Sequence, residues 1–363
     1  MKTILTFGEI MGRLCPENFQ RFRQSMPGKL DMTFAGAEAN VAASISMLGG
    51  NARFVTALPN NAISEVCLSV LDGIGIDTSG IQLTDYGRMG IYFVERGANQ
   101  RPSRVVYDRT ATAISLTPGA SYDWEQLAAD AQWLHTTGIT PALSEISAEA
   151  TLTAVKKAKQ HGLTVSCDLN FRKKLWQWDK STSAKELAQR TMREILPYVD
   201  VVIGNEEDAH DVLGISAENT DIEGGHIDGA KYSEVAQEIV RQFPNVKKVA
   251  ITLRESISAT HNNWSAMLYD AETQTPYFAP VNGGEYEPYE IRAIVDRVGG
   301  GDSFGAALIF ALTTPEFQHP QEAIRFAVAS SCLAHSINGD FNFSTRAEVE
   351  ALMKGSASGR VVR

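Results

Sequence analysis

The stretch from Ile291 to Leu312, IRAIVDRVGGGDSFGAALIFAL, changes its hydrophobic period in the middle. Alternate positions from 291 to 295 are apolar, which predicts a strand, and from Asp302 onward the apolar residues recur at helical spacing. The run from Gly299 to Gly301 lies between the two patterns. Successive glycines allow backbone N–H groups to line a concavity, and the following helix adds the positive end of its dipole. The sequence therefore predicts an anion-binding turn between a strand and a helix.

Two aspartates, Asp296 and Asp302, flank this turn. Asp302 could simply be the N-cap of the helix, a position that favours aspartate. In a second interpretation the stretch serves phosphoryl transfer. Gly299, Gly300 and Gly301 then hold the transferring phosphate, Asp302 takes the proton from an attacking hydroxyl, and Asp296 orients that substrate. The residues alone leave both interpretations open.

The run from Val295 to Phe304 resembles the C-terminal signature of the ribokinase/PfkB family of carbohydrate kinases, commonly D-T-x-G-A-G-D-x-F. Both aspartates and the outer glycines of the signature are present. Arg297 stands in place of the usual threonine and Gly300 in place of the usual alanine. The resemblance implies that the second aspartate is the catalytic base and that the glycines form the anion hole.

A second motif, GAEANVA, begins at Gly36 and resembles the sugar-binding signature of the same family, G-G-x-x-x-N. Asn40 could be a helix residue that faces solvent, since asparagine is common there. The resemblance instead implies that Gly36 and Asn40 bind the sugar, because an amide can bond both donor and acceptor hydroxyls. The opening FGEIMGRLCP resembles the branch of the family that acts on 2-keto-3-deoxy sugar acids, with Glu9 facing the sugar.

From Trp124 onward nearly all-apolar strands alternate with amphipathic helices. This cadence predicts a mostly parallel sheet that is covered by helices on both faces. Ligands bind at the carboxyl ends of the strands in such sheets. Polar residues gather at those predicted ends, namely Asp168, Asn170, Arg172, Asn205, Glu206, Thr252 and Arg254.

The resemblance assigns roles to these residues. Asp168 to Arg172 is similar to a D-x-N-x-R run of the sugar-acid branch, in which the arginine faces both substrate and phosphates. Asn205 to Asp208 resembles an N-x-x-E element that organises Mg²⁺ through water, and the resemblance implies that Glu206 has this role. It also implies that the following bind the nucleotide: Asn170, Arg172, Asn205, Thr252, Arg254, Gly299, Gly301 and Asp340.

Segments of about 14–35 and 88–112 depart from this cadence and predict a small β lid over the site. Tyr92, Tyr107 and Arg109 could be ordinary strand residues of a hairpin there. The resemblance implies that all three touch the substrate and that Arg109 binds a carboxylate. A hairpin with an exposed edge also favours a homodimer or higher homo-oligomer.

Composition narrows the class of protein. Of 363 residues 44% are hydrophobic and 21% charged, which is typical of a globular chain. The formal net charge of −10 opposes non-specific binding to nucleic acid or anionic membranes. No stretch resembles a signal peptide or a membrane span, and the four cysteines form no C-x-x-C pair, so a cytoplasmic location without a zinc site is expected.

These patterns predict an α/β fold, and the resemblance implies a ribokinase-like three-layer sandwich with a mostly parallel central sheet and a small β lid. Residues 1–345 form the predicted kinase domain, with a surface insertion at 221–231, and residues 346–363 form a C-terminal helix and tail. The implied activity is ATP-dependent phosphorylation of 2-keto-3-deoxygluconate to its 6-phosphate, with Mg²⁺ bridging the phosphates.

Three alternatives remain. A fructokinase or other neutral-sugar kinase is the nearest, although it would leave Arg109 and Arg172 without a carboxylate partner. A non-catalytic sugar-acid-binding protein would explain the changed positions of the signature. A dinucleotide-dependent oxidoreductase is disfavoured because no G-x-G-x-x-G follows the first strand.

Overall fold

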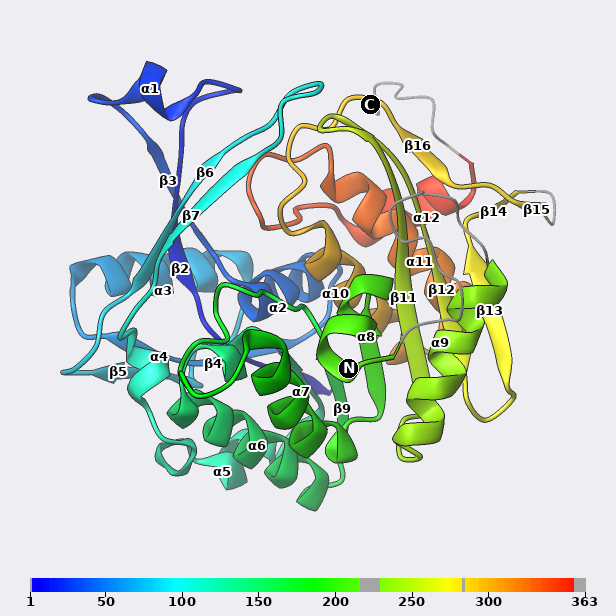
Figure 1. The fold of residues 1–363 in the computed structure, drawn as a ribbon, viewed down its shortest axis with the longest axis horizontal. Helices are drawn as coiled ribbons and strands as arrows, with labels where there is room; N and C mark the ends of the chain where they lie inside the picture. The colour runs from blue at the N-terminus through cyan, green and yellow to red at the C-terminus, as the bar shows by residue number, and fades with distance from the viewer. Residues whose placement is uncertain (1, 216–228, 283–284, 356–363) are drawn as a thin grey trace.

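The computed structural model describes residues 2–215, 229–282 and 285–355. A large sheet crosses the molecule in the order β13-β12-β11-β10-β9-β8-β1-β4-β5, with β16 beside β12 (Figure 1). Seven of its strands are parallel: β1 (Thr3–Phe7), β4 (Ala52–Pro59), β5 (Ile81–Thr84), β8 (Ala131–Thr137), β9 (Thr164–Asp168), β10 (Val201–Gly204) and β11 (Lys248–Ser258). The antiparallel strands are β12 (His261–Asp270), β13 (Thr275–Ala279) and β16 (Tyr289–Ile291).

Helices cover both faces of this sheet, because its strands alternate between two apolar cores. In β1, Leu5 and Phe7 belong to one core and Ile4 to the other. The first face is covered by α4 (Ala113–Leu116), α5 (Trp124–Ala128), α6 (Glu145–Gln160), α7 (Ala184–Ile195), α8 (Glu206–Leu213) and α9 (Gly229–Gln242). The second is covered by α2 (Ala37–Met47), α3 (Ala62–Ile74), α10 (Gly300–Leu312), α11 (Pro320–Ala334) and α12 (Arg346–Met353). The predicted three-layer α/β sandwich is confirmed.

A small sheet stands beside the carboxyl ends of the parallel strands (Figure 1). Its strands are β3 (Asp31–Ala35), β2 (Met11–Cys15), β6 (Gly90–Glu95) and β7 (Arg104–Asp108), in that order, and α1 (Phe22–Ser25) connects β2 to β3. The hairpin predicted near 89–109 is therefore present as β6 and β7. A further two-stranded sheet joins β14 (Val281–Asn282) to β15 (Glu285–Tyr286).

The prediction of a strand at 291–295 is wrong. β16 ends at Ile291, and the chain reaches the glycines as a loop. Ile294 is buried while Val295 is exposed, which is the reverse of the expected alternation. Single hydrogen bonds hold the loop, from Ile294 N–H to Thr260 and from Val295 N–H to His335. Tertiary contacts therefore outweigh the local pattern here.

The strand predicted before Thr252 is longer than expected. β11 continues to Ser258 and pairs with β12 along its whole length, so Thr252 and Arg254 lie within a strand and not in a loop after it. The predicted insertion at 221–231 lies outside the described residues up to 228, and α9 begins at Gly229.

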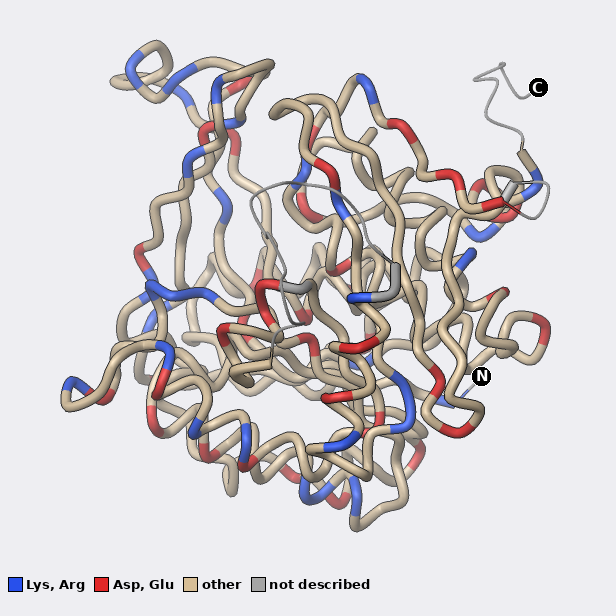
Figure 2. Tube along the Cα trace, turned by 45° about the vertical axis from the view of Figure 1, so that its right-hand side comes forward, with Lys and Arg blue, Asp and Glu red and all other residues tan. Residues whose placement is uncertain are grey.

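Charged positions of both signs are interspersed along the outer helices (Figure 2). The chain as a whole is nevertheless acidic, with a formal net charge of −10. In the described part of the chain, none of the helices combines the length and the hydrophobicity that a membrane crossing requires. Any binding of anions must therefore depend on local groups.

Candidate active site

A cavity of about 700 Å³ opens between the carboxyl ends of the parallel strands and the inner face of the small sheet. Such a volume fits a small-molecule site, and its position agrees with the rule for parallel sheets. Most of the predicted site residues line it: Glu9, Gly36, Asn40, Tyr92, Tyr107, Arg109, Asn170, Arg172, Asn205, Thr252, Arg254, Gly299, Gly301, Asp302 and Asp340.

The glycine turn, Gly299–Gly301, lies at the start of α10. Gly299 is its N-cap with φ +86°, and an added Cβ would lie 2.3 Å from the carbonyl oxygen of Asp340, so only glycine fits. Among the described residues, the N–H groups of Gly301 and Asp302 have no backbone acceptor. They are available to an anion at the positive end of the helix dipole. Gly300 faces away from the cavity, against the ring of His335.

Asp302 is the third residue of α10 and not its N-cap, so the capping interpretation is wrong. Its Oδ2 accepts a hydrogen bond of 2.6 Å from Nδ2 of Asn40. Burial raises the pKa of Asp302 to about 6, against the lowering effect of the Asn40 bond. The group is therefore a carboxylate at neutral pH, but one with the proton affinity of a general base.

Asn40 does not face solvent, because it is 1% exposed. Its Oδ1 accepts from Gly36 N–H at 3.2 Å, which fixes the amide so that its NH₂ group points toward Asp302. Gly36 itself packs on the backbone of Glu9, where an added Cβ would lie 1.9 Å from the carbonyl oxygen. The motif thus places two neighbouring polar groups at the floor of the cavity.

Glu38, in the same motif, is a cavity residue that the sequence analysis did not single out. Its Oε1 accepts from the N–H and Oγ1 of Thr137 and from Oγ1 of Thr140, and its Oε2 has no partner among the described residues. Burial raises its pKa to about 7. Gly8 makes room for it, since a Cβ there would lie 2.0 Å from Cδ of Glu38. An acidic residue within an otherwise small and apolar helix was the available signal.

Arg109 and Glu9 form a buried ion pair at the side of the cavity under the small sheet. Nε of Arg109 and Oε1 of Glu9 have no partner among the described residues. The guanidinium lies 5.3 Å from the ring centre of Tyr107, which is itself 6.0 Å from the ring of Tyr92. Both residues line the cavity, so a cation and an anion lie side by side in this wall.

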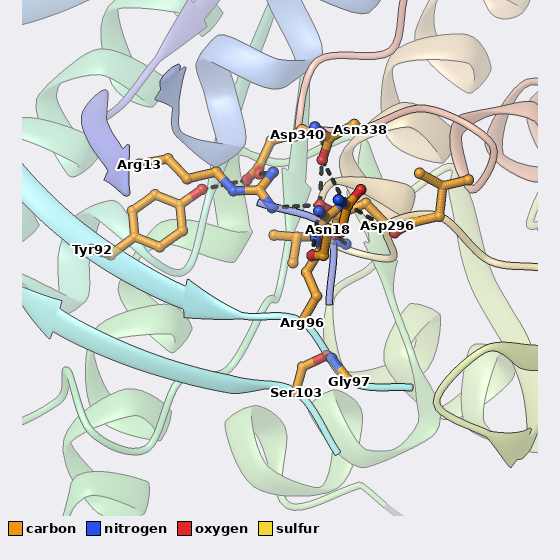
Figure 3. Close-up of polar contacts among 12 residues, drawn as sticks. Arg13, Asn18, Tyr92, Arg96, Gly97, Ser103, Asp296, Asn338 and Asp340 are labelled. Atoms are coloured by element: carbon orange, nitrogen blue, oxygen red, sulfur yellow. Dashed lines mark hydrogen bonds and ion pairs between the residues drawn. The ribbon is translucent and has the colours of Figure 1, made fainter. Parts of the chain in front are cut away.

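Asp296 does not line the cavity, although it was predicted to face the substrate. Its carboxylate pairs with Nη2 of Arg13, a buried residue of β2 (Figure 3). Asp340 accepts from Nη1 of Arg13 at 2.7 Å and from the hydroxyl of Tyr92 at 2.7 Å. Its carboxylate therefore lies on the small-sheet side of the cavity. Arg13 was missed because nothing in its local sequence indicates partners so distant.

Arg254 and Arg297 line a second part of the cavity, together with Thr252 and Trp264. Burial, and then the charge of Arg254, lower the pKa of Arg297. No carboxylate in the described ranges pairs with either arginine. Two uncompensated cations beside the glycine turn favour a polyanion. Arg172 also lines the cavity, and its Nη1 donates to the carbonyl of Phe171 at 3.0 Å.

The predicted metal element is the start of α8. Asn205 caps the helix by accepting from Asp208 N–H at 2.9 Å, and Asp208 accepts from the N–H groups of Asn205 and Phe171. The side chain of Glu206 lies outside the described part. Burial raises the pKa of Asp168 and of Asp208, and neither carboxylate forms an ion pair within the described residues. The two fit Mg²⁺, which takes few protein carboxylates and the oxygens of a phosphate.

Comparison with known proteins agrees with this site. The model of the pfkB family carbohydrate kinases matches residues 1–343. A crystal structure of 2-dehydro-3-deoxygluconokinase from Thermotoga maritima superposes with a TM-score of 0.87 and 44% identity, over 98% of this chain and 100% of that one. This superposition confirms for the present chain the ribokinase-like sandwich that its sequence led us to expect.

Two curated relatives differ in the sugar that their names give. A 2-dehydro-3-deoxygalactonokinase of Haloferax volcanii is 29% identical over 98% of each chain. A probable fructokinase of Arabidopsis thaliana is 25% identical over 97% of each chain. Because the family model spans nearly the whole chain and the signature aspartate and glycines meet at one cavity, this protein belongs to the PfkB family of carbohydrate kinases.

Proposed function

We propose that the protein phosphorylates the 6-hydroxyl of 2-keto-3-deoxygluconate with ATP. The observation that carries this proposal is the Asn40–Asp302 pair, which places a carboxylate of raised pKa beside the N–H groups of the glycine turn. A base and an anion-binding turn at one point are the two groups that phosphoryl transfer to a hydroxyl requires. The 44% identity to a protein named 2-dehydro-3-deoxygluconokinase supports the same substrate.

The reaction uses these groups as follows. Asp302 accepts the proton of the 6-hydroxyl while the oxygen attacks the γ-phosphorus of ATP. The bond between that phosphorus and its bridging oxygen breaks, and ADP leaves with the electron pair. The N–H groups of Gly301 and Asp302 donate to the oxygens of the moving phosphoryl group. Asn40 holds Oδ2 of the base, which leaves Oδ1 for the substrate.

The acid group of the substrate distinguishes this proposal from a fructokinase. Arg109 is buried, and its Nε has no partner in the described part of the chain, although Glu9 neutralises part of its charge. A substrate carboxylate that reaches the exposed part of this guanidinium gains a charge-assisted hydrogen bond. Arg172 gives a second cation at the other side. A neutral sugar would leave both arginines without a ligand carboxylate.

Arg254 and Arg297 are the groups that we assign to the phosphates of ATP, since they are cationic and pair with no carboxylate of the described residues. Asp208, supported by its two backbone donors, and Asp168 would hold Mg²⁺, directly or through water. When bound, the ion neutralises the phosphate oxygens and so lowers the charge that the protein has to stabilise.

We assign the outer face of the small sheet to contact with a second copy of the chain. Leu14 is opposite Met32 and Phe93, and Phe93 is opposite Val106, so the four residues form one row on a single face. Met32 is 46% and Val106 54% exposed. A contiguous exposed apolar patch marks an interaction surface, and a two-fold homodimer is the commonest soluble oligomer. Light scattering of the purified protein, with Val106→Lys as the disrupting variant, tests this assignment.

A substrate panel tests the proposed function. Purified protein and MgATP are incubated separately with 2-keto-3-deoxygluconate, its galactonate epimer, fructose and ribose, and ADP release is followed. We expect the highest kcat/KM for 2-keto-3-deoxygluconate. Equal efficiency with fructose would reject the sugar-acid assignment, and a preference for the epimer would correct the sugar. Binding of the acid without ADP release would identify a non-catalytic binding protein.

A further inference from the structure

Arg13 is a fully buried arginine that the proposed reaction does not use. It lies on β2 of the small sheet, and its side chain is among the largest that are less than 2% exposed. Its two terminal nitrogens bind two different carboxylates, Asp296 by Nη2 and Asp340 by Nη1 (Figure 3). The planar fork of a guanidinium offers a separate nitrogen to each of two carboxylates, whereas an ammonium group is a single point charge.

Both partners belong to loops that adjoin the glycine turn. Asp296 precedes the turn, and its Oδ1 accepts from Val298 N–H at 3.2 Å. Asp340 touches the turn directly, because its carbonyl oxygen occupies the space beside Cα of Gly299. The loop from 292 to 298 has no regular strand pairing. Besides the backbone bonds of Ile294 and Val295, the two carboxylates are therefore groups that connect this loop and the turn to the small sheet.

Two further side chains, from β6 and the residue just after it, bind the same loops as Arg13. Tyr92 of β6 donates to Oδ2 of Asp340, at 2.7 Å. Arg96, just after β6, donates to Oδ1 of Asn338 at 2.7 Å and to the carbonyl of Val295. Figure 3 shows these side chains meeting the loops at 295–296 and 338–340. Counting the bonds of Arg13, residues of the small sheet and its end thus hold the loop at 295–296 by two contacts and the loop at 338–340 by three.

We propose that Arg13 is a positioning residue for phosphoryl transfer, which sets the glycine turn in place relative to the ligand wall of the small sheet. This inference rests on the proposed function. A misplacement of the reacting groups by about 1 Å can lower the rate roughly a hundredfold. A bridge between the small sheet, which lines the sugar side of the cavity, and the glycine turn therefore affects the rate directly. A buried ion pair is a weak source of stability, which argues against a purely structural role.

The chain offers a matched control. Arg53 also bridges two aspartates, Asp77 at 2.6 Å and Asp130 at 2.8 Å. It lies near the amino end of β4, whereas the cavity lies at the carboxyl ends of the parallel strands. Arg13→Lys and Arg53→Lys each keep the charge and remove the fork. We expect kcat to fall at least tenfold in Arg13→Lys, with the KM for ATP within about threefold of wild type. Arg53→Lys should stay within about twofold in both constants.

The result that overturns the inference is a lower melting temperature of Arg13→Lys with an unchanged kcat per folded molecule. Hydrogen exchange of the ligand-free protein gives a readout that does not depend on activity. We expect faster exchange at 294–301 and 338–342 in Arg13→Lys and not in Arg53→Lys. Unchanged exchange there rejects the bridge even if the enzyme has a different substrate. If wild type is inactive on every sugar but exchange responds, the proposed function fails and the bridge stands.

If Arg13→Lys does not fold, Asp296→Asn takes its place. This variant keeps the size of the side chain and removes one of the two charges that Arg13 binds. The same increase of exchange at 338–342 is expected, because Asp340 then shares an arginine that is less fixed. Exchange equal to that of wild type would again contradict the inference.

Discussion

Asn40 and Asp302 lie 262 residues apart in the chain and are joined by a hydrogen bond of 2.6 Å. The bond connects the first turn of α2 with the first turn of α10, so two helix starts meet at one point of the cavity. Since the amide of Asn40 is itself held by Gly36, it can only donate to the carboxylate. This arrangement fixes one oxygen of Asp302 and leaves the other for the substrate.

The raised pKa of Asp302 predicts the pH dependence of the reaction. Only the carboxylate accepts a proton, so kcat/KM for the sugar should be constant above about pH 7 and fall about tenfold per unit below pH 6. An aspartate in water, with a pKa of about 3.9, would keep the rate nearly constant down to about pH 5. The measurement uses saturating MgATP and a buffer of constant ionic strength. A profile that is flat down to about pH 4.5 would show that the pKa of the catalytic base is not raised, contrary to the burial of Asp302.

Arg297 stands where the family signature has threonine, which predicts a test of the phosphate contacts. Arg297→Thr should raise the KM for ATP or lower kcat/KM for ATP by roughly one to two powers of ten, since a charge-assisted contact contributes about 1.5–3 kcal/mol. The KM for the sugar should change little. Arg292→Thr is the control, because Arg292 is exposed and pairs with Glu290. Equal effects of the two variants would show a general effect of charge.

Sequence patterns predicted the parts of the site that are coded locally. The motifs around Asn40 and Asp302 both lie in the first turn of a helix, although α10 begins at Gly300 and not at Asp302. The glycines between 299 and 301 do lie at the start of this helix. The parallel sheet followed from all-apolar strands that alternate with helices. Because parallel strands end at one edge, most of the polar residues after them do meet at the cavity.

Sequence patterns failed where distant contacts decide. The alternation at 291–295 resembled a strand, but Ile294 is buried and the segment is a loop. Asp296 was expected at the substrate, whereas Arg13 of the small sheet holds it. Glu38 was missed because its partners, Thr137 and Thr140, lie about a hundred residues away. Apart from the acidic character of Glu38 within its helix, none of these contacts is indicated by the neighbouring sequence.

The buried pair of Arg109 and Glu9 predicts opposite effects of single and double variants on stability. Arg109→Gln leaves a buried carboxylate without its cation and should lower the free energy of unfolding by about 3–5 kcal/mol. The double variant Glu9→Gln, Arg109→Gln removes both charges and should recover most of this loss. Urea denaturation of the four proteins measures the cycle. A double variant as unstable as the sum of the singles would show that the two groups act independently.

The central claim is that Asp302 is the base, and replacement by asparagine tests it most directly. Asp302→Asn keeps the shape of the side chain but cannot take the proton, so kcat should fall about a hundredfold or more. Asp270→Asn is the control, since Asp270 is a buried aspartate at the end of β12 that pairs with Lys248. We expect Asp302→Asn to melt near wild type, to bind sugar and ATP, and to lose at least about 99% of kcat. An Asp302→Asn enzyme that keeps most of its kcat would contradict the account, because the reaction would then need another base.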